Sequence, residues 1–259
     1  MYFKDKKEFI KFLRALDSEK SYIGGGAQGD CYRSGSNVYK VYKYWYLDDF
    51  SSLDRDYVLR FKSIKTKRFM FPKDTISVGE KTVGDITTFV DGELLYNIDP
   101  LSVPLTLLSK LVKPVIEDIK VLSSSGVRIY DVMYNIILGS KLSVIDTAEY
   151  GSLSKDAKWL LDQNMQAFNA SIVDFLIDGY FTKLISENAV LREMYESNGR
   201  DVDLTAFISE LKRYLSDIMG HEINKMAQAQ KYIDDENSGG FERNPVLKSY
   251  QRVIARKGL

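Results

Sequence analysis

The stretch Ile23-Gly-Gly-Gly-Ala-Gln-Gly-Asp-Cys-Tyr32 says most about the fold of this chain. Its Gly24, Gly26 and Gly29 form the pattern G-x-G-x-x-G, and the residues before and after it have the composition of short strands. Glycines lack a Cβ, so they let backbone amides approach phosphate oxygens closely. A glycine-rich hairpin without a ligand is the alternative interpretation. A dinucleotide-binding fold would need a helix after the glycines, and the pattern predicts a strand there instead.

A lysine follows in the next predicted strand, within Val38-Tyr-Lys-Val41. Side chains alternate along a strand, so Lys40 is expected on the face opposite to Tyr39 and Val41. In that position it could direct its ammonium group at phosphates beneath the glycine-rich stretch, or it could be an edge residue. Lys43 is the second candidate for the same role.

Three oxygen-bearing side chains follow in the segment 126–146, which alternates between aliphatic runs and polar residues. Asp131 comes first, Asn135 precedes the run Ile136-Ile-Leu138, and Asp146 ends a second aliphatic run. Carboxylate and amide oxygens are the ligands that Mg²⁺ prefers. Asp and Asn are also common turn residues, and this interpretation applies to each of them taken separately.

The pattern elsewhere predicts an α+β protein with a small β-rich part at 1–90 and a larger helical part at 91–259. The first part is expected to hold a helix in its first twenty residues, further strands around 74–77 and 83–90, and a helix over 48–65. The second part is expected to hold helices at 103–125, 155–178, 183–196 and 204–219, with Pro114 bending or dividing the first of them.

Composition excludes several kinds of protein. The 259 residues carry 36 basic and 36 acidic side chains, so the basic excess of a typical nucleic-acid-binding protein is missing. No apolar run is long enough to cross a bilayer, and charged residues near the start disfavour a secretory signal. With Cys31 and His221 as the one cysteine and the one histidine, a disulfide or a zinc centre is not expected. The sequence predicts a cytoplasmic protein without nucleic-acid or membrane partners.

Taken in order, these features resemble the protein-kinase superfamily across residues 20 to 150. Gly24, Gly26 and Gly29 match its glycine-rich loop, and Lys40 takes the place of its third-strand lysine. The run Thr87-Thr-Phe-Val-Asp-Gly92 is similar to the hinge between lobes. Further matches are Asp131 with the catalytic-loop aspartate, Asn135 with the metal-binding asparagine, and Asp146 with the aspartate of the second metal motif.

The resemblance implies a two-lobed fold and an enzyme that transfers phosphate from ATP with Mg²⁺. Asp131 and Lys40 would then be catalytic, and Asn135 and Asp146 would hold the metal ion. Its implied nucleotide contacts are Ile23, Gly24, Gly26, Gly29, Cys31, Lys40 and Phe89.

The chain also departs from the family pattern. Ile129 and Tyr130 stand where the family has histidine and arginine, and no glutamate between residues 48 and 65 can pair with Lys40, which leaves Asp56 as the favoured partner. The segment after Asp146 is short, so no activation-loop control is expected. A protein serine/threonine kinase is the preferred function. A small-molecule kinase of the aminoglycoside or choline type and a weakly active nucleotide-binding protein are the alternatives.

Overall fold

A computed structural model describes residues 1–18, 21–43, 54–177, 184, 187–197 and 202–234. The protein is of the α+β class, with a β-rich N-terminal sheet and a helical C-terminal part. The chain divides into two compact units: the first comprises Met1–Asp91 and Val144–Tyr150, and the second comprises the rest. The predicted boundary between 1–90 and 91–259 differs from this division because residues 144–150 return to the first unit.

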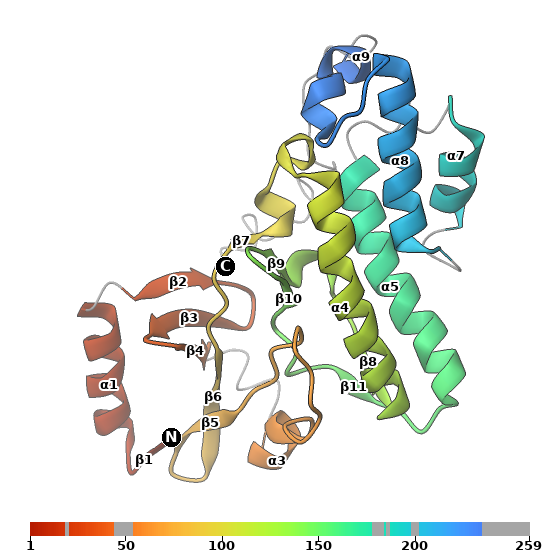
Figure 1. Cartoon of the computed structure of the whole chain (residues 1–259). Helices are drawn as coiled ribbons and strands as arrows, with labels where there is room; N and C mark the ends of the chain where they lie inside the picture. Colours follow the sequence, from red (N-terminus) through yellow and green to blue (C-terminus); the bar gives the residue numbers. More distant parts are fainter. Residues whose placement is uncertain (19–20, 44–53, 178–183, 185–186, 198–201, 235–259) are drawn as a thin grey trace. The chain divides into compact units, whose positions relative to one another are not determined.

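The first unit is built on a six-stranded sheet (Figure 1). Its strand order is β1-β5-β6-β4-β3-β2, in which only the β1–β5 pair is parallel. The bounds are β1 Tyr2–Phe3, β2 Tyr22–Gly25, β3 Gly29–Ser34, β4 Asn37–Tyr42, β5 Asp74–Val78 and β6 Lys81–Thr88. The strands predicted from the sequence are therefore all present. The turns at Gly35 and Gly79 have positive φ values of 59° and 56°, which glycine adopts without strain.

Two helices of the first unit lie within the described residues. Helix α1, Lys6–Ser18, confirms the helix predicted at the start of the chain, and its Phe12 ring packs edge-on against Tyr39 of β4. Because side chains alternate along β4, α1 covers the face of the sheet opposite to Lys40. The helix predicted over 48–65 falls partly outside the described residues. Within them, helix α3 is limited to Arg55–Leu59, and the side chain of Asp54 caps its N-terminus.

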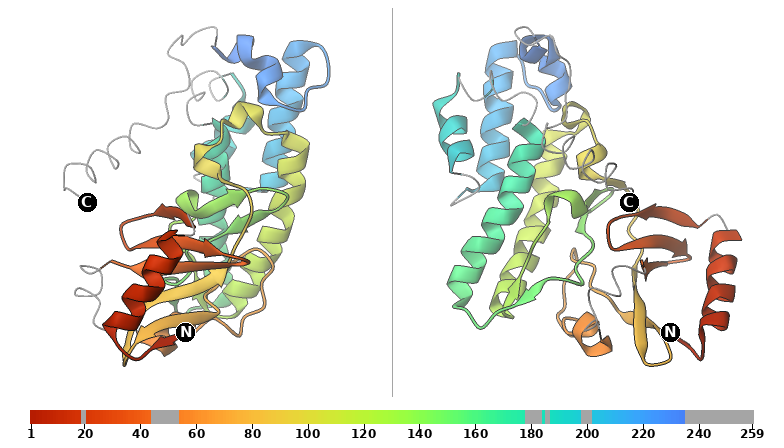
Figure 2. Two further views of the ribbon diagram at one scale, coloured as in Figure 1. Left: turned by 90° about the vertical axis from the view of Figure 1, so that its left-hand side faces the viewer. Right: turned by 180° about the vertical axis from the view of Figure 1, so that it is seen from behind.

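The second unit is mainly helical, with α4 and α5 side by side (Figures 1 and 2). Helix α4 continues through Pro114, so of the two effects predicted for this proline, bending or division, division does not occur. Within the described residues its helices are α4 Leu105–Ser124, α5 Ala157–Ile177, α7 Ala189–Glu196, α8 Leu204–Met219 and α9 Gln230–Asp234, with 3₁₀ turns at Leu95–Asn97, Pro100–Ser102, Met133–Asn135 and Met226–Ala229. Its short strands are β7 Glu93–Leu94, β8 Val127–Arg128, β9 Ile136–Leu138, β10 Leu142–Val144 and β11 Gly151–Ser152.

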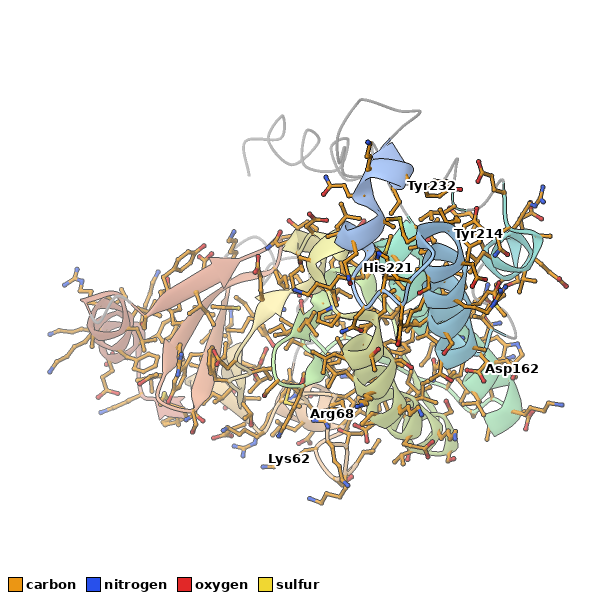
Figure 3. All side chains as sticks on the ribbon, turned by 45° about the horizontal axis from the view of Figure 1, so that its top comes forward. Lys62, Arg68, Asp162, Tyr214, His221 and Tyr232 are labelled. Carbon is orange, nitrogen blue, oxygen red and sulfur yellow. The ribbon has the colours of Figure 1, made fainter. Side chains whose placement is uncertain are left out.

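A glycine ends helix α8, and a pair of tyrosines joins this helix to α9. Gly220 ends the helix with a φ of 69°, and the exposed His221 follows it (Figure 3). The hydroxyl groups of Tyr214 in α8 and Tyr232 in α9 lie 2.9 Å apart and join these two helices. None of the described helices has the length and apolar character needed to cross a lipid bilayer.

Candidate functional site

Lys40 lies at the centre of the sheet of the first unit. In the strand register it is opposite Cys31 of β3 on one side and opposite Asp85 of β6 on the other. Directly opposed residues of antiparallel strands share a face, so these three side chains form a polar row across the sheet. The Lys40 side chain is only 12% exposed, so its charge needs partners inside the protein.

Two groups contact the ammonium of Lys40 directly. Its Nζ forms an ion pair with Asp146, a residue 106 positions later in the chain. It also donates a hydrogen bond of 2.6 Å to Oε1 of Gln28, at the end of the glycine-rich turn. Burial by itself lowers the pKa of Lys40, but the carboxylates of Asp146 and Asp85 outweigh this effect and the pKa is raised. Lys40 is therefore a charged group held between the turn and Asp146.

The position of Asp146 is explained by backbone pairing of the segment 144–150 with residues 68–70. The amide of Val144 donates to the carbonyl of Arg68 at 2.7 Å, and the amide of Met70 donates to the carbonyl of Val144 at 2.9 Å. The hydroxyl of Thr147 then donates to the carbonyl of Met70 at 3.0 Å. This pairing brackets Asp146 on both sides and holds it within the first unit.

Aromatic packing anchors the end of the same segment. Tyr150 is 1% exposed and packs edge-on against Phe69 and Phe71, with ring centroids 6.2 Å apart in both pairs. The guanidinium of Arg60 donates to the carbonyl of Tyr150 and lies over the ring of Tyr57. The sequence analysis did not identify this anchor, although the cluster Phe69-Met-Phe71 is a visible aromatic signal.

Asp131 and Asp146 share an unusual backbone conformation. They are the two non-glycine residues with positive φ in the described part of the chain, with φ values of 49° and 55°. Such conformations are uncommon for residues with a side chain, and they concentrate at functional sites. The sequence predicts a functional role for both aspartates from their side-chain chemistry, and their backbone conformation supports that role independently.

The glycine-rich stretch is a hairpin between β2 and β3 that is closed by the hydrogen bond from the amide of Gly26 to the carbonyl of Gly29, 2.9 Å long. A Cβ on Gly29 would lie 2.5 Å from the carbonyl oxygen of Val41, so packing explains that glycine. Gly26 is exposed, and a Cβ there would meet nothing within 4 Å. Packing therefore does not explain Gly26. The carbonyl of Gly26 accepts a hydrogen bond of 2.9 Å from Lys43, which is the role of this second lysine.

Asp85 is a candidate that the sequence analysis missed. It is 2% exposed, and its Oδ2 accepts a hydrogen bond of 2.9 Å from the hydroxyl of Tyr42. Burial raises the pKa of Asp85 to about 6, although Lys40 and the Tyr42 hydrogen bond act in the opposite direction. A carboxylate inside a predicted strand, in Val83-Gly-Asp-Ile86, was the signal available in the sequence. The favoured partner Asp56 is exposed in the first turn of α3, and Lys40 pairs with Asp146 instead.

The remaining predicted nucleotide contacts also lie in the first unit. Ile23 in β2 is 49% exposed, and Cys31 in β3 is partly buried beside Lys40. Phe89 follows β6, and the guanidinium of Arg33 lies over its ring, 3.6 Å from the ring centroid. Because Arg33 covers one face of this ring, Phe89 could contact a ligand only through its other face or its backbone.

Asp131 and Asn135 form a second group, within the second unit. The side-chain amide of Asn135 donates a hydrogen bond of 2.9 Å to the backbone carbonyl of Asp131. This bond uses a donor of Asn135 and leaves its carbonyl oxygen as the atom suited to a cation. The carboxylate of Asp131 is exposed. No group of three or more His, Cys, Asp or Glu side chains suited to a metal ion occurs among the described residues.

Asn164 of α5 holds the backbone segment that precedes Asp131, a role that was not predicted from the sequence. Asn164 is fully buried, and its Oδ1 accepts hydrogen bonds from the backbone amide of Ile129 at 3.0 Å and from Arg128 at 3.2 Å. Its amide nitrogen donates to the carbonyl of Val127 at 2.8 Å and to Ser123 at 3.0 Å. All the hydrogen-bonding capacity of this buried side chain is thus used, three of the four bonds by residues 127–129 just before Asp131 and one by Ser123 of α4.

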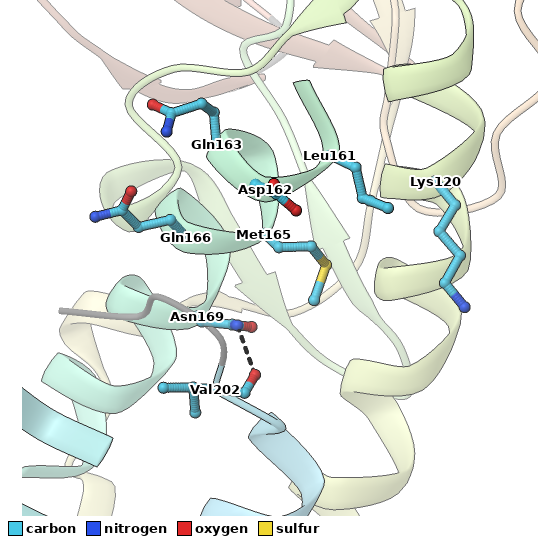
Figure 4. A pocket seen from close by; sticks show the side chains of 8 residues that line it. All are labelled: Lys120, Leu161, Asp162, Gln163, Met165, Gln166, Asn169 and Val202. Carbon is cyan, nitrogen blue, oxygen red and sulfur yellow. Dashed lines mark hydrogen bonds between the residues drawn. The ribbon is translucent and has the colours of Figure 1, made fainter. Parts of the chain in front are cut away.

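A hollow of about 400 Å³ lies in the second unit along α4 and α5 (Figure 4). Its lining mixes amide, apolar and charged side chains, and the amide of Asn169 donates a hydrogen bond of 2.8 Å to the carbonyl of Val202 there. The residues predicted from the sequence to form the site are not among those that line it, which are Lys120, Leu161, Asp162, Gln163, Met165, Gln166, Asn169 and Val202.

No model of a known protein family matches the chain, and a comparison with curated proteins finds no relative of it. We therefore infer its function from the geometry of its own residues.

Proposed function

We propose that this chain is an ATP- and Mg²⁺-dependent phosphotransferase with a two-lobed, protein kinase-like fold, acting as a protein serine/threonine kinase. The observation that carries this proposal is the ion pair between Lys40 and Asp146. Each was selected separately from the sequence, one for phosphate binding and the other for metal binding. Their pairing across 106 positions supports a shared site for a nucleotide and its cation.

In the first unit, Lys40 has the position and charge to bind phosphate oxygens. Its contacts with Gln28 and Asp146 satisfy the ammonium group when phosphate is absent. A ligand can reach the contact with Asp146, because that side chain is 34% exposed. Gly26 is exposed in the adjoining hairpin, where no Cβ blocks the approach of an anion, and its amide donates to the carbonyl of Gly29 when no ligand is bound. These features support a phosphate site beside Lys40.

In the second unit, Asp131 has an exposed carboxylate suited to orient an acceptor hydroxyl group. In the proposed reaction the hydroxyl oxygen forms a bond to the γ-phosphorus while the bond from this phosphorus to the β–γ bridging oxygen breaks. ADP leaves, and the hydroxyl proton passes to Asp131. Asp146 and the carbonyl oxygen of Asn135 would hold Mg²⁺, which supplies neutralisation of phosphate charge.

Two features support a protein acceptor without activation-loop control. Helix α4 is the one long helix between Gly92 and Asp131, so this region has no room for the extra helices usual in small-molecule kinases of similar sequence pattern. After Asp146, residues 147–150 are held to the first unit, and β11 pairs with β8 at 151–152. Because this segment is short and already paired, it contains few residues that phosphorylation of an activation loop could order.

The test is transfer of labelled γ-phosphate from ATP in the presence of Mg²⁺, scored on the protein itself, on a generic protein acceptor and on small alcohols. We expect Lys40→Met and Asp146→Asn to lower the rate by about 100-fold or more, since each removes a preorganised charge. Lys81→Met is the matched control, because Lys81 is an exposed lysine at the end of β6 in the same sheet.

The outcomes separate the possible functions. Transfer to small alcohols alone would indicate a small-molecule kinase. Nucleotide binding without transfer would indicate a nucleotide-binding protein that acts through other means. Equal effects of Lys40→Met and Lys81→Met would contradict the proposed role of Lys40. Lys43→Met is expected to have a smaller effect than Lys40→Met, because Lys43 contacts the hairpin backbone and Asp30.

A further inference from the structure

Two carboxylates, those of Asp146 and Asp85, lie near Lys40, and they differ in their exposure to solvent. Asp146 belongs to a segment that returns from the second unit, and its side chain is 34% exposed. Asp85 lies inside β6, directly opposite Lys40 in the strand register, and is 2% exposed. Water and ligands can therefore reach Asp146, whereas Asp85 is enclosed by the sheet and its neighbours.

The position of Asp85 is fixed by a hydrogen bond and by the close approach of β6 to β4. The hydroxyl of Tyr42 donates to its Oδ2 at 2.9 Å, and Tyr42 is itself 6% exposed. Tyr42 lies two residues from Lys40 in β4, so both side chains are on the same face. The preceding Gly84 allows β6 to lie close to β4, because any Cβ at this position would collide with the carbonyl oxygen of Lys40. The sheet itself thus sets the distance between Asp85 and Lys40.

A carboxylate is rarely buried in a protein interior unless a partner group offsets the cost of burying its charge. Without a nearby cation, an ionised carboxylate strongly destabilises the folded state. Among the described residues, the charged and titratable groups that act on Asp85 are Lys40, Tyr42, Asp146 and Cys31, and of these only Lys40 is a cation. Asp85 is therefore retained beside a specific charge, and that charge belongs to the residue on which the proposed function depends.

We propose that Asp85 is the permanent counter-charge of Lys40 and the positioning residue that keeps its ammonium group in place when Asp146 and Gln28 release it. This inference rests on the proposed function, in which Lys40 turns to phosphate and Asp146 to a cation. One carboxylate cannot neutralise Lys40 and ligate a metal ion with the same oxygens. The segment 48–65 holds no glutamate to take over, and the enclosed Asp85 fills this role from the sheet.

The pairing itself is tested by a double-mutant cycle on thermal unfolding of the nucleotide-free protein. The variants are Lys40→Met, Asp85→Asn and the two together. Removing Lys40 leaves Asp85 without its cation, so Asp85→Asn should raise the unfolding midpoint by about 5 °C more in the Lys40→Met background than in the natural protein. Asp30→Asn is the matched control, because Asp30 pairs with Lys43, and it should add to Lys40→Met without coupling. Simple additivity for Asp85 would overturn the proposed pairing.

The positioning role is tested by titrating Asp85→Asn with Mg·ATP and with adenosine, which has no phosphates. We expect about tenfold weaker binding of Mg·ATP and unchanged binding of adenosine, since only phosphate contacts depend on Lys40. A general structural defect would weaken both ligands alike, and that result, or unchanged Mg·ATP binding, would overturn the inference. If Asp85→Asn does not fold, Tyr42→Phe carries the test, with a smaller loss for Mg·ATP only.

The same measurements separate failure of the inference from failure of the proposed function. If the natural protein binds neither Mg·ATP nor adenosine, the proposed function is wrong. The unfolding cycle then still decides whether Asp85 is the counter-charge of Lys40, because it uses no nucleotide. If the natural protein binds Mg·ATP and the cycle shows no coupling, the proposed function stands and the role of Asp85 is rejected.

Discussion

The side-chain oxygen of Asn164 in α5 accepts the backbone amide of Ile129, two residues before Asp131, at a distance of 3.0 Å. The same side chain donates to the carbonyl of Val127 at 2.8 Å. A single buried amide thus ties the strand that precedes Asp131 to the long helix behind it. The orientation of the proposed catalytic carboxylate therefore depends on a helix that begins after it in the sequence.

The first prediction concerns this link. Asn164→Ala should lower the free energy of unfolding by about 2–4 kcal/mol, because buried partners lose their hydrogen bonds and a cavity is left. Turnover should fall while the affinity for Mg·ATP, which depends on Lys40, stays unchanged. Urea unfolding and a comparison of kcat with KM measure both effects. Asn169→Ala is the control: Asn169 is a buried asparagine of the same helix that bonds Val202, so stability should fall without a specific loss of turnover.

The second prediction contrasts two glycines of one hairpin. Gly29→Ala should destabilise the protein by about 2–4 kcal/mol, because its Cβ would lie 2.5 Å from the carbonyl oxygen of Val41. Gly26→Ala should change stability by less than about 0.5 kcal/mol, since its Cβ meets nothing. Gly26→Ala should nevertheless weaken Mg·ATP binding several-fold, because the Cβ stands where phosphate would approach. If Gly26→Ala binds Mg·ATP normally, the hairpin is a structural turn only.

The third prediction concerns the reactivity of Cys31. Burial raises its pKa to about 11, and Asp146, Asp85 and Asp30 add to this while Lys40 opposes it. A raised pKa means that little thiolate is present near neutral pH, so alkylation should be about 100-fold slower than for a free thiol. The rate should rise about tenfold for each pH unit between pH 7.5 and 9.5, as mass spectrometry can follow.

Cys31 also neighbours Lys40, which adds a ligand effect to the same experiment. If Cys31 lines the nucleotide site, Mg·ATP should slow its alkylation further. An alkylation rate that levels off below pH 9 would contradict the raised pKa, and a rate indifferent to Mg·ATP would remove Cys31 from the nucleotide site.

The fourth prediction is the pH dependence of stability due to Asp85. Its pKa is about 6 in the folded protein, against 3.8 for the ordinary carboxyl. Between these values the folded state holds a proton that the unfolded state has lost, so this contribution to stability falls as pH rises from about 4 to 6 and is constant above. The decrease amounts to about 2–3 kcal/mol.

Asp85→Asn removes the titrating group and should abolish this decrease. Urea unfolding of both proteins at pH 4.5, 6 and 7.5 measures it. The variant should gain stability relative to the natural protein as pH rises through this range. A constant difference between the two proteins across the three pH values would show that Asp85 titrates normally.

The sequence by itself was sufficient for the strands of the first unit other than β1, which lies within the first twenty residues where a helix was predicted, and for most helices. Alternating β-branched and aromatic residues specify β4. Gly35 marks the turn between β3 and β4, and Gly79 marks the turn between β5 and β6. Helix α8 has the predicted bounds Leu204–Met219, because its apolar period is regular and both ends carry strong signals, Asp203 and Gly220. Local patterns are enough where the structure depends on local interactions.

Tertiary structure alone decided which side chains meet. No local pattern could place Asp146 in the same unit as Lys40, because this follows from strand-like pairing of Val144 with residues 68–70 and from the packing of Tyr150. The role of Asp85 likewise depends on the register between β4 and β6. Asn164 reads as one polar residue in a helix until the fold places it behind Ile129. Contacts between distant parts of a chain depend on the packing of the whole unit, and the sequence pattern near each residue does not contain that information.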